Sequence, residues 1–346
     1  MSSSIKSVAL KAGVSVATVS RVINGTGPVA EETRSRILDA IEKLRYVPHM
    51  AARSLITNQT DTAGVLLPDL YGEFFSEVIR GIDLAARRNG FHVLVSGFHS
   101  DRAEIEAVLR AMRGRVDGLI VLSPDVDAQT LQRNLPETLP VVLLNTPLPT
   151  PVDGISFDSI NVDNHGGAFA MVRHLASLGH LRIAFIQGPA ENVDAQERLR
   201  GYRDALGSLG SEISPDWEIE GDFSEESGFQ AGRRILELRP RPTAVFAAND
   251  SMAVGCLFAL REAGVRVPGE VAVAGFDDIP IARYITPALS SVHVPIAELG
   301  TRAMERLLLA VASKNEHERR QETVATTLVV RGSCGGAADP RTVGNL

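Results

Sequence analysis

From residue 62 onward, short apolar runs alternate with longer amphipathic ones. The apolar runs are GVLLPDL, FHVLVSGF, GLIVLSP, PVVLLN, RIAFIQG, TAVFAAND and VAVAGFDD, and TVATTLVVR at 323–331 predicts one late strand. Between many of them lie helical patterns such as FFSEVIRGIDLAARRNG, AEIEAVLRAMRG and MAVGCLFALREAG. Continuous apolar strands that alternate with amphipathic helices are typical of parallel sheets covered on both faces. Because one small sheet cannot hold so many strands, the pattern predicts two doubly wound parallel α/β subdomains.

The first sixty residues show a different pattern of apolar and polar positions, which predicts helices at 5–12, 16–23 and 31–45. Ser4 and Ser15 are suited to cap the first two helices, and Gly13 supplies the left-handed turn between them. Two short helices joined by a turn form a helix-turn-helix when a third helix completes their core. We expect that core to contain Val8, Leu10, Val19, Val22, Ile37, Ile41 and Leu44.

On the second helix, several residues fall on the face opposite the expected core. The N-terminal part of this helix in a helix-turn-helix enters the major groove. Arg21 matches the N7 and O6 acceptors of guanine, while Val16 and Ala17 suit the methyl group of thymine. Thr18, Ser20 and Asn24 can hydrogen-bond to phosphates, which sets register. The alternative is a three-helix bundle that merely exposes a valine.

Charge is distributed unevenly along the chain. Residues 1–60 hold eight Lys or Arg and four Asp or Glu, a net charge of +4, so the remainder of the −7 chain carries −11. A basic head on an acidic body indicates that the head binds a polyanion.

Several function classes find no support in the sequence. No signal peptide or membrane span is apparent. This favours a cytoplasmic, nucleoid-associated protein that does not bind a membrane. The two cysteines, Cys256 and Cys334, have no metal-binding spacing, and we expect no metal site and no cofactor. GxxxxGK, GxGxxG, GxSxG and HExxH motifs are missing, so an enzyme is not expected.

The runs IKSVALKAGVSVATVSRVIN, VAEETRSRILDAIEKLRYVP and AARSLITNQT resemble the head and hinge of LacI/GalR-family transcription regulators. The resemblance continues in ERLRGYRDAL, FAANDSMAVG, VAGFDDIPIARYITPALSSVHVP and LVVRGS. It implies a repressor that binds a palindromic operator as a homodimer, with Val16, Ala17 and Arg21 as base readers. It also implies that Leu55, beside the small Ala51, wedges into the minor groove. Two positions depart from the family pattern: Ala30 replaces a Ser or Thr cap, and Ser7 replaces an acidic residue.

In open α/β sheets, ligands bind beyond the carboxyl ends of the strands. Acids, amides and aromatic residues follow the predicted strands, which suits a polyhydroxylated ring such as a sugar. Asp250 is expected to serve mainly as a helix cap, and Asp163 as a residue of the cleft or of a turn. The resemblance adds an effector-contacting Arg198 and places Asn145 where many relatives have Asp. The candidate effector-binding residues are Asp69, Tyr71, Phe74, Phe75, Asn145, Arg198, Phe223, Asn249 and Asp277.

The predicted organisation has five parts. They are a DNA-binding domain (1–48), a hinge helix and linker (49–61), an N-terminal effector subdomain (62–161 and 292–322), a C-terminal effector subdomain (162–291 and 323–334) and a tail (335–346).

The function expected is a DNA-binding regulator controlled by a small effector, a sugar or sugar derivative. Induction and corepression both stay open, as do dimer and tetramer, although the C-terminus shows no heptad repeat. A periplasmic-type sugar-binding protein and an enzyme on the same architecture are the competing hypotheses.

Overall fold

A computed structural model gives the fold. It divides the chain into two compact units, residues 1–61 and 62–346. Most of the hinge segment at 49–61 lies outside the residues that the structure describes, as does the tail after 336. The described residues are 4–25, 27–46, 59–98, 102–123, 128–146, 157–211, 214–313 and 317–336.

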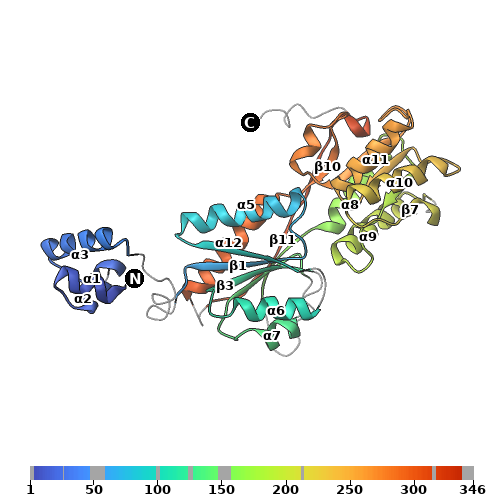
Figure 1. Cartoon of the computed structure of the whole chain (residues 1–346). Helices are drawn as coiled ribbons and strands as arrows, with labels where there is room; N and C mark the ends of the chain where they lie inside the picture. The colour runs from blue at the N-terminus through green and yellow to red at the C-terminus, as the bar shows by residue number, and fades with distance from the viewer. Residues whose placement is uncertain are drawn as a thin grey trace. The chain divides into compact units, whose positions relative to one another are not determined.

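The first unit contains α1 (Ile5–Ala12), α2 (Val16–Asn24) and α3 (Glu31–Leu44), close to the predicted bounds (Figure 1). The Ser4 side chain accepts a hydrogen bond from the Ser7 backbone N–H, and the Ser15 side chain accepts one from the Thr18 N–H. Gly13 has a φ of 67°, as the predicted left-handed turn requires. Ala30 precedes α3 without a side-chain cap, so this helix begins with less support.

The core of the three helices differs from the prediction at one position. Val8, Val19 and Ile37 are fully buried, but Leu10 is 86% exposed, so its assignment to the core is wrong. Residue 10 follows Val8 by two positions, which places it about 200° around the helix axis. Ala9 and Ala12 fill the core instead.

The second unit consists of two lobes, each built on a parallel sheet. The sheet of the first lobe has six strands within the described residues, in the order β11-β5-β4-β3-β1-β2. The elements of the first lobe are β1 (Thr62–Leu67), α5 (Glu73–Arg88), β2 (His92–Gly97), α6 (Arg102–Met112), β3 (Gly118–Leu122), α7 (Ala128–Asn134), β4 (Val141–Leu144), β5 (Asp158–Val162), α12 (Ile296–Ser313) and β11 (Gln321–Val324).

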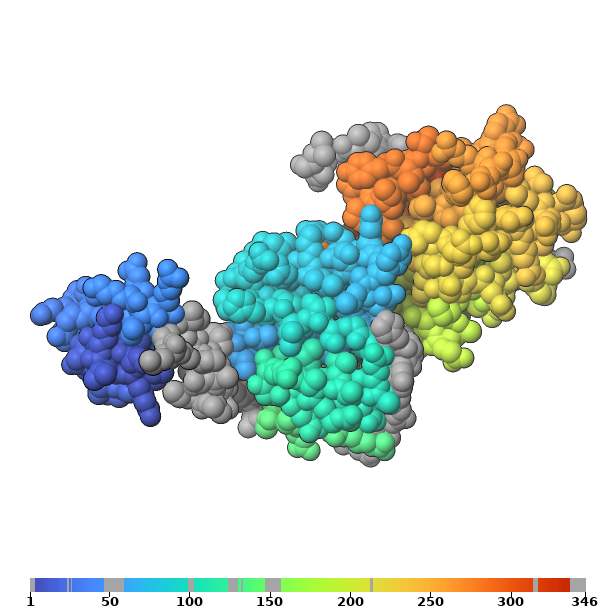
Figure 2. Space-filling view, viewed as in Figure 1, coloured from blue at the N-terminus to red at the C-terminus, as the bar shows by residue number. Residues whose placement is uncertain are grey.

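The sheet of the second lobe also has six strands in the described part of the chain, in the order β12-β10-β9-β8-β6-β7, and β12 is antiparallel to β10. Figure 2 shows the blue to green atoms of the first lobe against the yellow and orange atoms of the second. The elements of the second lobe are α8 (Asn164–Ser177), β6 (Ile183–Ile186), α9 (Val193–Ser208), η1 (Pro215–Trp217), β7 (Glu218–Ile219), α10 (Glu225–Glu237), β8 (Ala244–Ala247), α11 (Asp250–Glu262), β9 (Ala272–Asp277), η2 (Pro280–Arg283), β10 (Ser290–His293), β12 (Thr327–Val329) and η4 (Gly332–Cys334).

Strand β1 shows why the apolar runs are continuous. Val65 and Leu67 belong to the large core cluster under α5 and α12, whereas Leu66 belongs to a second cluster under α6 and α7. Figure 1 shows these two helix pairs on opposite faces of the sheet. A strand with two buried faces needs apolar side chains at every position. The predicted fold class is therefore confirmed.

The chain crosses between the lobes three times, slightly later than predicted. Strand β5 stays in the first lobe up to Val162, and β10 stays in the second up to His293. The predicted late strand at 323–331 is in fact two strands, since β11 pairs with β5 and β12 pairs with β10. The crossing between Val324 and Thr327 falls inside the continuous run TVATTLVVR, which holds no Gly or Pro to mark it.

Candidate DNA-reading helix and effector cleft

Helix α2 presents the face that the sequence analysis assigned to DNA. Val16 is 40% exposed, and Ala17 and Arg21 are also exposed, whereas Val19 and Val22 are buried on the opposite side. Apolar and cationic side chains are thus available together on one helix face. Such a surface can contact base edges in a major groove.

The other predicted DNA-contacting residues are less exposed, or lie at the edge of the described region or outside it. Thr18 and Ser20 are half-buried, and the Thr18 hydroxyl lies 2.9 Å from the Ser15 hydroxyl, so it also supports the helix cap. Asn24 is the last residue of α2. Ala51 and Leu55 lie outside the described residues, so the hinge wedge stays a prediction.

A cleft of about 700 Å³ lies between the two lobes, and all nine candidate effector residues line it. Asp69, Phe74 and Asn145 come from the first lobe, while Arg198 and Asp277 come from the second. The other lining residues were not among the predicted candidates. They are Pro68, Gly72, Glu73, Leu122, Pro189, Glu191, Asn192, Asp194, Asp222, Ser224, Ser251 and Ile279.

Three residues of the cleft wall have a left-handed backbone, although none is glycine. The φ angles are 45° at Asn145, 73° at Phe223 and 104° at Asp277. Non-glycine residues seldom adopt positive φ, and such conformations concentrate at functional sites. All three side chains line the cleft.

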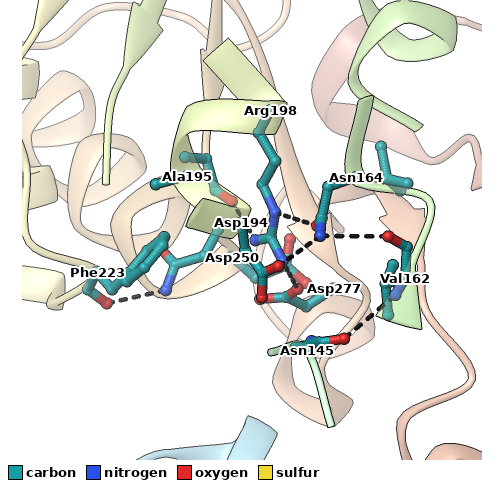
Figure 3. A network of polar contacts seen from close by, with 12 residues as sticks. Asn145, Val162, Asn164, Asp194, Ala195, Arg198, Phe223, Asp250 and Asp277 are labelled. Carbon is teal, nitrogen blue, oxygen red and sulfur yellow. Dashed lines mark hydrogen bonds and ion pairs between the residues drawn. The ribbon is translucent and has the colours of Figure 1, made fainter. Parts of the chain in front are cut away.

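Arg198 is the centre of a polar network at the floor of the cleft (Figure 3). Its Nε donates to Asn164 Oδ1 at 2.8 Å, and its Nη1 donates to the Ala248 carbonyl at 2.6 Å. Its Nη2 lies 3.2 Å from Asp277 Oδ1, and its guanidinium carbon lies 3.8 Å from the centre of the Phe276 ring. The arginine is only 4% exposed, so the second lobe fixes its position before any ligand arrives.

Close packing of α9 on α8 brings Arg198 to this position. A side chain at Gly201 would place its Cβ 2.3 Å from the His165 carbonyl oxygen. The glycine therefore permits the approach of the two helices. Arg198 lies one turn earlier on α9 and reaches Asn164 at the start of α8.

Two carboxyl groups share this arginine. Burial raises the pKa of Asp277 to about 6, against the opposing charge of Arg198. Burial likewise raises the pKa of Asp194 to about 6, although Arg198 and hydrogen bonds from Asn164 and Asn145 lower it. Asn164 Nδ2 donates to Asp194 Oδ1 at 2.8 Å. The floor of the cleft therefore offers acceptors whose charge is only partly compensated.

The predicted roles of two acids, Asp250 and Asp163, change or become definite. Asn249, not Asp250, caps α11, with its side chain accepting from the Met252 N–H. Asp250 is buried, and it accepts from the Ser291 hydroxyl at 2.6 Å and from the Ile279 N–H at 2.9 Å. Burial, followed by the nearby charge of Asp277, raises the pKa of Asp250 well above its ordinary value. Asp163 caps α8 by accepting from the Gly166 N–H and does not line the cleft.

Asp194 is the main functional candidate that the sequence analysis missed. It lies in the first turn of α9, one turn before Arg198. The run ENVDAQERLR contained the signal, since Asp194 precedes the arginine by four residues, which places both on one face of a helix. Acids also occupy the first turns of several other helices, such as α3, α10 and α11, so the spacing alone did not distinguish Asp194.

Within the described residues, no group of three or more His, Cys, Asp or Glu side chains could hold a metal ion. Cys256 and Cys334 are both buried and unpaired by disulfide. No helix in the described part of the chain is long and apolar enough to cross a bilayer.

Comparisons with known proteins decide the family. Residues 4–49 match the family described as bacterial regulatory proteins, lacI family, and residues 172–334 match the periplasmic binding protein-like domain. The chain is 36% identical to the HTH-type transcriptional repressor PurR of Photobacterium profundum, over 95% of this chain and 98% of that protein. This chain belongs to the LacI family. The ribose operon repressor of Escherichia coli is also 36% identical, over 95% of this chain and 99% of that one.

Solved LacI-family structures agree with this assignment. The lac repressor dimer bound to operator and the anti-inducer ONPF has a TM-score of 0.85 and 30% identity, covering 96% of this chain and 99% of that chain. A LacI-family regulator from Enterococcus faecium with bound ribose has a TM-score of 0.71 and 29% identity, covering 79% and 98%. The chain is a DNA-binding transcriptional regulator controlled by a small-molecule effector, and the expected family and function are confirmed. The relatives named here are transcription regulators, not enzymes.

Proposed function

We propose that this chain is a repressor that reads a palindromic operator as a homodimer, through α2 and the hinge segment at 49–61. Arg21 is the guanine-reading residue, and Val16 and Ala17 contact thymine methyl groups. Ala51 and Leu55 enter the minor groove at the centre of the operator. Thr18, Ser20 and Asn24 contact phosphates. Action on chromosomal DNA implies work in the cytoplasm, at the nucleoid.

The effector in this proposal is a sugar or sugar derivative bound in the cleft. The observation that carries it is the convergence of Asn145, Asp194, Arg198 and Asp277 at the cleft floor, with aromatic rings in the same wall. Carboxylate and amide oxygens accept from hydroxyl groups, and Phe74, Phe75, Tyr71 and Phe223 can cover the C–H side of a ring. Asp69 and Asn249 complete the polar wall. The ribose and operator named for the relatives support this ligand class and this partner.

The effector controls operator binding by changing how the two lobes are arranged. Glu73 at the start of α5 accepts a hydrogen bond from the Ile281 N–H at 2.9 Å, which joins the first lobe to the second beside the cleft. A ligand shifts the lobes only by the difference between its affinities for the two arrangements. Induction and corepression differ in which arrangement the ligand prefers.

A gel-shift assay with genomic fragments at two salt concentrations tests this function. One fragment should be retained tightly, and its affinity should fall steeply with salt because phosphate contacts release counterions. Sugars added to the retained complex then reveal the effector and the sign of its effect. Uniformly weak binding to all fragments, unaltered by Arg21→Ala, would contradict the proposal.

A further inference from the structure

The charges that line the cleft are strongly unbalanced. Arg198 is the only Lys, Arg or His among the described residues that line it. The acids of the same wall outnumber it, and after residue 61 the sequence holds a single lysine, Lys314. The lining acids are Asp69, Glu73, Glu191, Asp194, Asp222 and Asp277.

The hydrogen-bonding capacity of Arg198 is largely used within the protein. Its Nε and Nη1 donate to Asn164 and to the Ala248 carbonyl, and its Nη2 faces Asp277. Recognition of a phosphate or carboxylate by arginine depends on two parallel N–H donors directed at the anion. The positions of these partners leave the guanidinium poorly placed for such a bidentate contact.

Helix N-termini are the other common anion sites, and four of them reach the cleft. The side chains of Asn192, Ser224 and Asn249 cap α9, α10 and α11, and each accepts a hydrogen bond from a backbone N–H of the first turn. Each of these helices also has an acid in its first turn, and α5 begins with Glu73. Acids at these ends already compensate the helix dipoles and repel a further anion.

A buried acceptor on the cleft floor completes the pattern. Asp277 is only 5% exposed, and its Oδ1 accepts no hydrogen bond of normal geometry from the described residues, although Arg198 Nη2 lies 3.2 Å away. Buried polar atoms normally have a hydrogen-bond partner. The atom can therefore accept a further hydrogen bond, which a ligand hydroxyl group can donate and a phosphate dianion cannot.

We propose that the cleft selects uncharged polyhydroxylated ligands and rejects their phosphorylated or carboxylated forms. This inference rests on the proposed function and narrows its ligand class. A negative group in the cleft would meet several carboxylates whose charge one arginine only partly compensates, in a partly desolvated space where juxtaposed like charges are strongly unfavourable.

Calorimetric titration of the full chain at pH 7.5 with matched pairs of compounds tests the inference. The pairs are D-ribose and D-ribose 5-phosphate, D-galactose and D-galacturonate, cellobiose and cellobionate, and adenosine and adenosine monophosphate. At least one neutral member should bind, and its charged partner should bind at least about 100-fold more weakly. A charged member that binds within tenfold of its neutral partner, or binding by no neutral member, would overturn the inference.

A charge-reversal variant separates electrostatic rejection from simple size exclusion. Glu191 is an exposed residue of the cleft wall that lies outside the proposed effector contacts. Glu191→Lys should reduce the preference for the neutral member by about tenfold at low salt. Glu262→Lys is the matched control, because Glu262 ends α11 roughly 18 Å from the cleft end of that helix. An unchanged preference in Glu191→Lys would contradict the electrostatic account.

The same preparation is assayed for operator retention. Retention together with binding of charged ligands refutes only the ligand selectivity and leaves the regulatory function intact. Loss of specific DNA binding would instead refute the proposed function.

Discussion

Replacement of Asp277 by asparagine should stabilise the second lobe at neutral pH, although the residue sits at the floor of the cleft. The side chain is 5% exposed, and its one close cationic neighbour, Arg198, is shared with Asp194. Asparagine keeps the shape and an acceptor oxygen. It also tolerates the φ of 104° at this position better than most residues do.

The size of the effect follows from the pKa of Asp277. Burial raises that pKa from 3.8 to about 6, while Arg198 lowers it and Asp194 raises it. Between pH 3.8 and about 6, the folded chain keeps the Asp277 proton, whereas the unfolded chain has released it. Stability therefore falls by about 3 kcal/mol as the pH rises through this window. Asp277→Asn removes this penalty, so the gain approaches 3 kcal/mol at pH 7.5 and disappears near pH 4.

The neighbouring Asp278 provides a control of opposite sign. Burial raises its pKa, but hydrogen bonds and charge from His293 and Arg331 outweigh burial, and the pKa lies below its ordinary value. Its charge therefore stabilises the folded chain at neutral pH, and this contribution is lost as the pH falls. Asp278→Asn should cost roughly 1–3 kcal/mol at pH 7.5.

Urea unfolding of the full chain at pH 7.5 and pH 4.5, followed by tryptophan fluorescence, measures both variants. Trp217 is the single tryptophan and is buried in the second lobe, so its emission reports on that lobe. A lower midpoint for Asp277→Asn at pH 7.5, or the same gain at both pH values, would refute this reasoning. We also expect the stabilised variant to respond more weakly to effector, as in other trade-offs between stability and function.

Four further outcomes are expected. Arg21→Ala should weaken specific operator binding by about 1–3 kcal/mol in a gel-shift titration, and equal losses on specific and random DNA would argue against a base contact. Leu55→Ala should weaken operator binding more than random-DNA binding, and equal losses would remove the wedge hypothesis. Arg198→Ala should abolish the effector response while the variant still binds operator, and it should lower the stability of the second lobe by roughly 3–5 kcal/mol because two carboxylates lose their shared cation. Ala30→Ser should raise the stability of the three-helix unit by about 1 kcal/mol by supplying the missing cap of α3, and no change in its thermal midpoint would count against that role.

Helix caps, turns and helix bounds could be predicted from the sequence because they depend on residues that are close together in the chain. The caps at Ser4 and Ser15, the turn at Gly13 and the bounds of α1 and α2 appear as expected. Leu10 was misassigned because an eight-residue helix holds too few apolar residues to define its buried face. The family resemblance added Arg198, which periodicity alone could not single out among the arginines of the chain.

The apolar runs by themselves determined that the body is a pair of helix-covered parallel sheets, since only strands buried on both faces need such continuous hydrophobicity. The acids, amides and aromatic residues that follow these runs predicted a ligand site at the strand ends. Only the tertiary structure decided that β11 and β12 lie in different sheets, that Asn249 caps α11 while Asp250 is buried, and that Asp194 joins Asp277 at Arg198. These outcomes depend on contacts between segments far apart in the chain, whose energies no local pattern encodes.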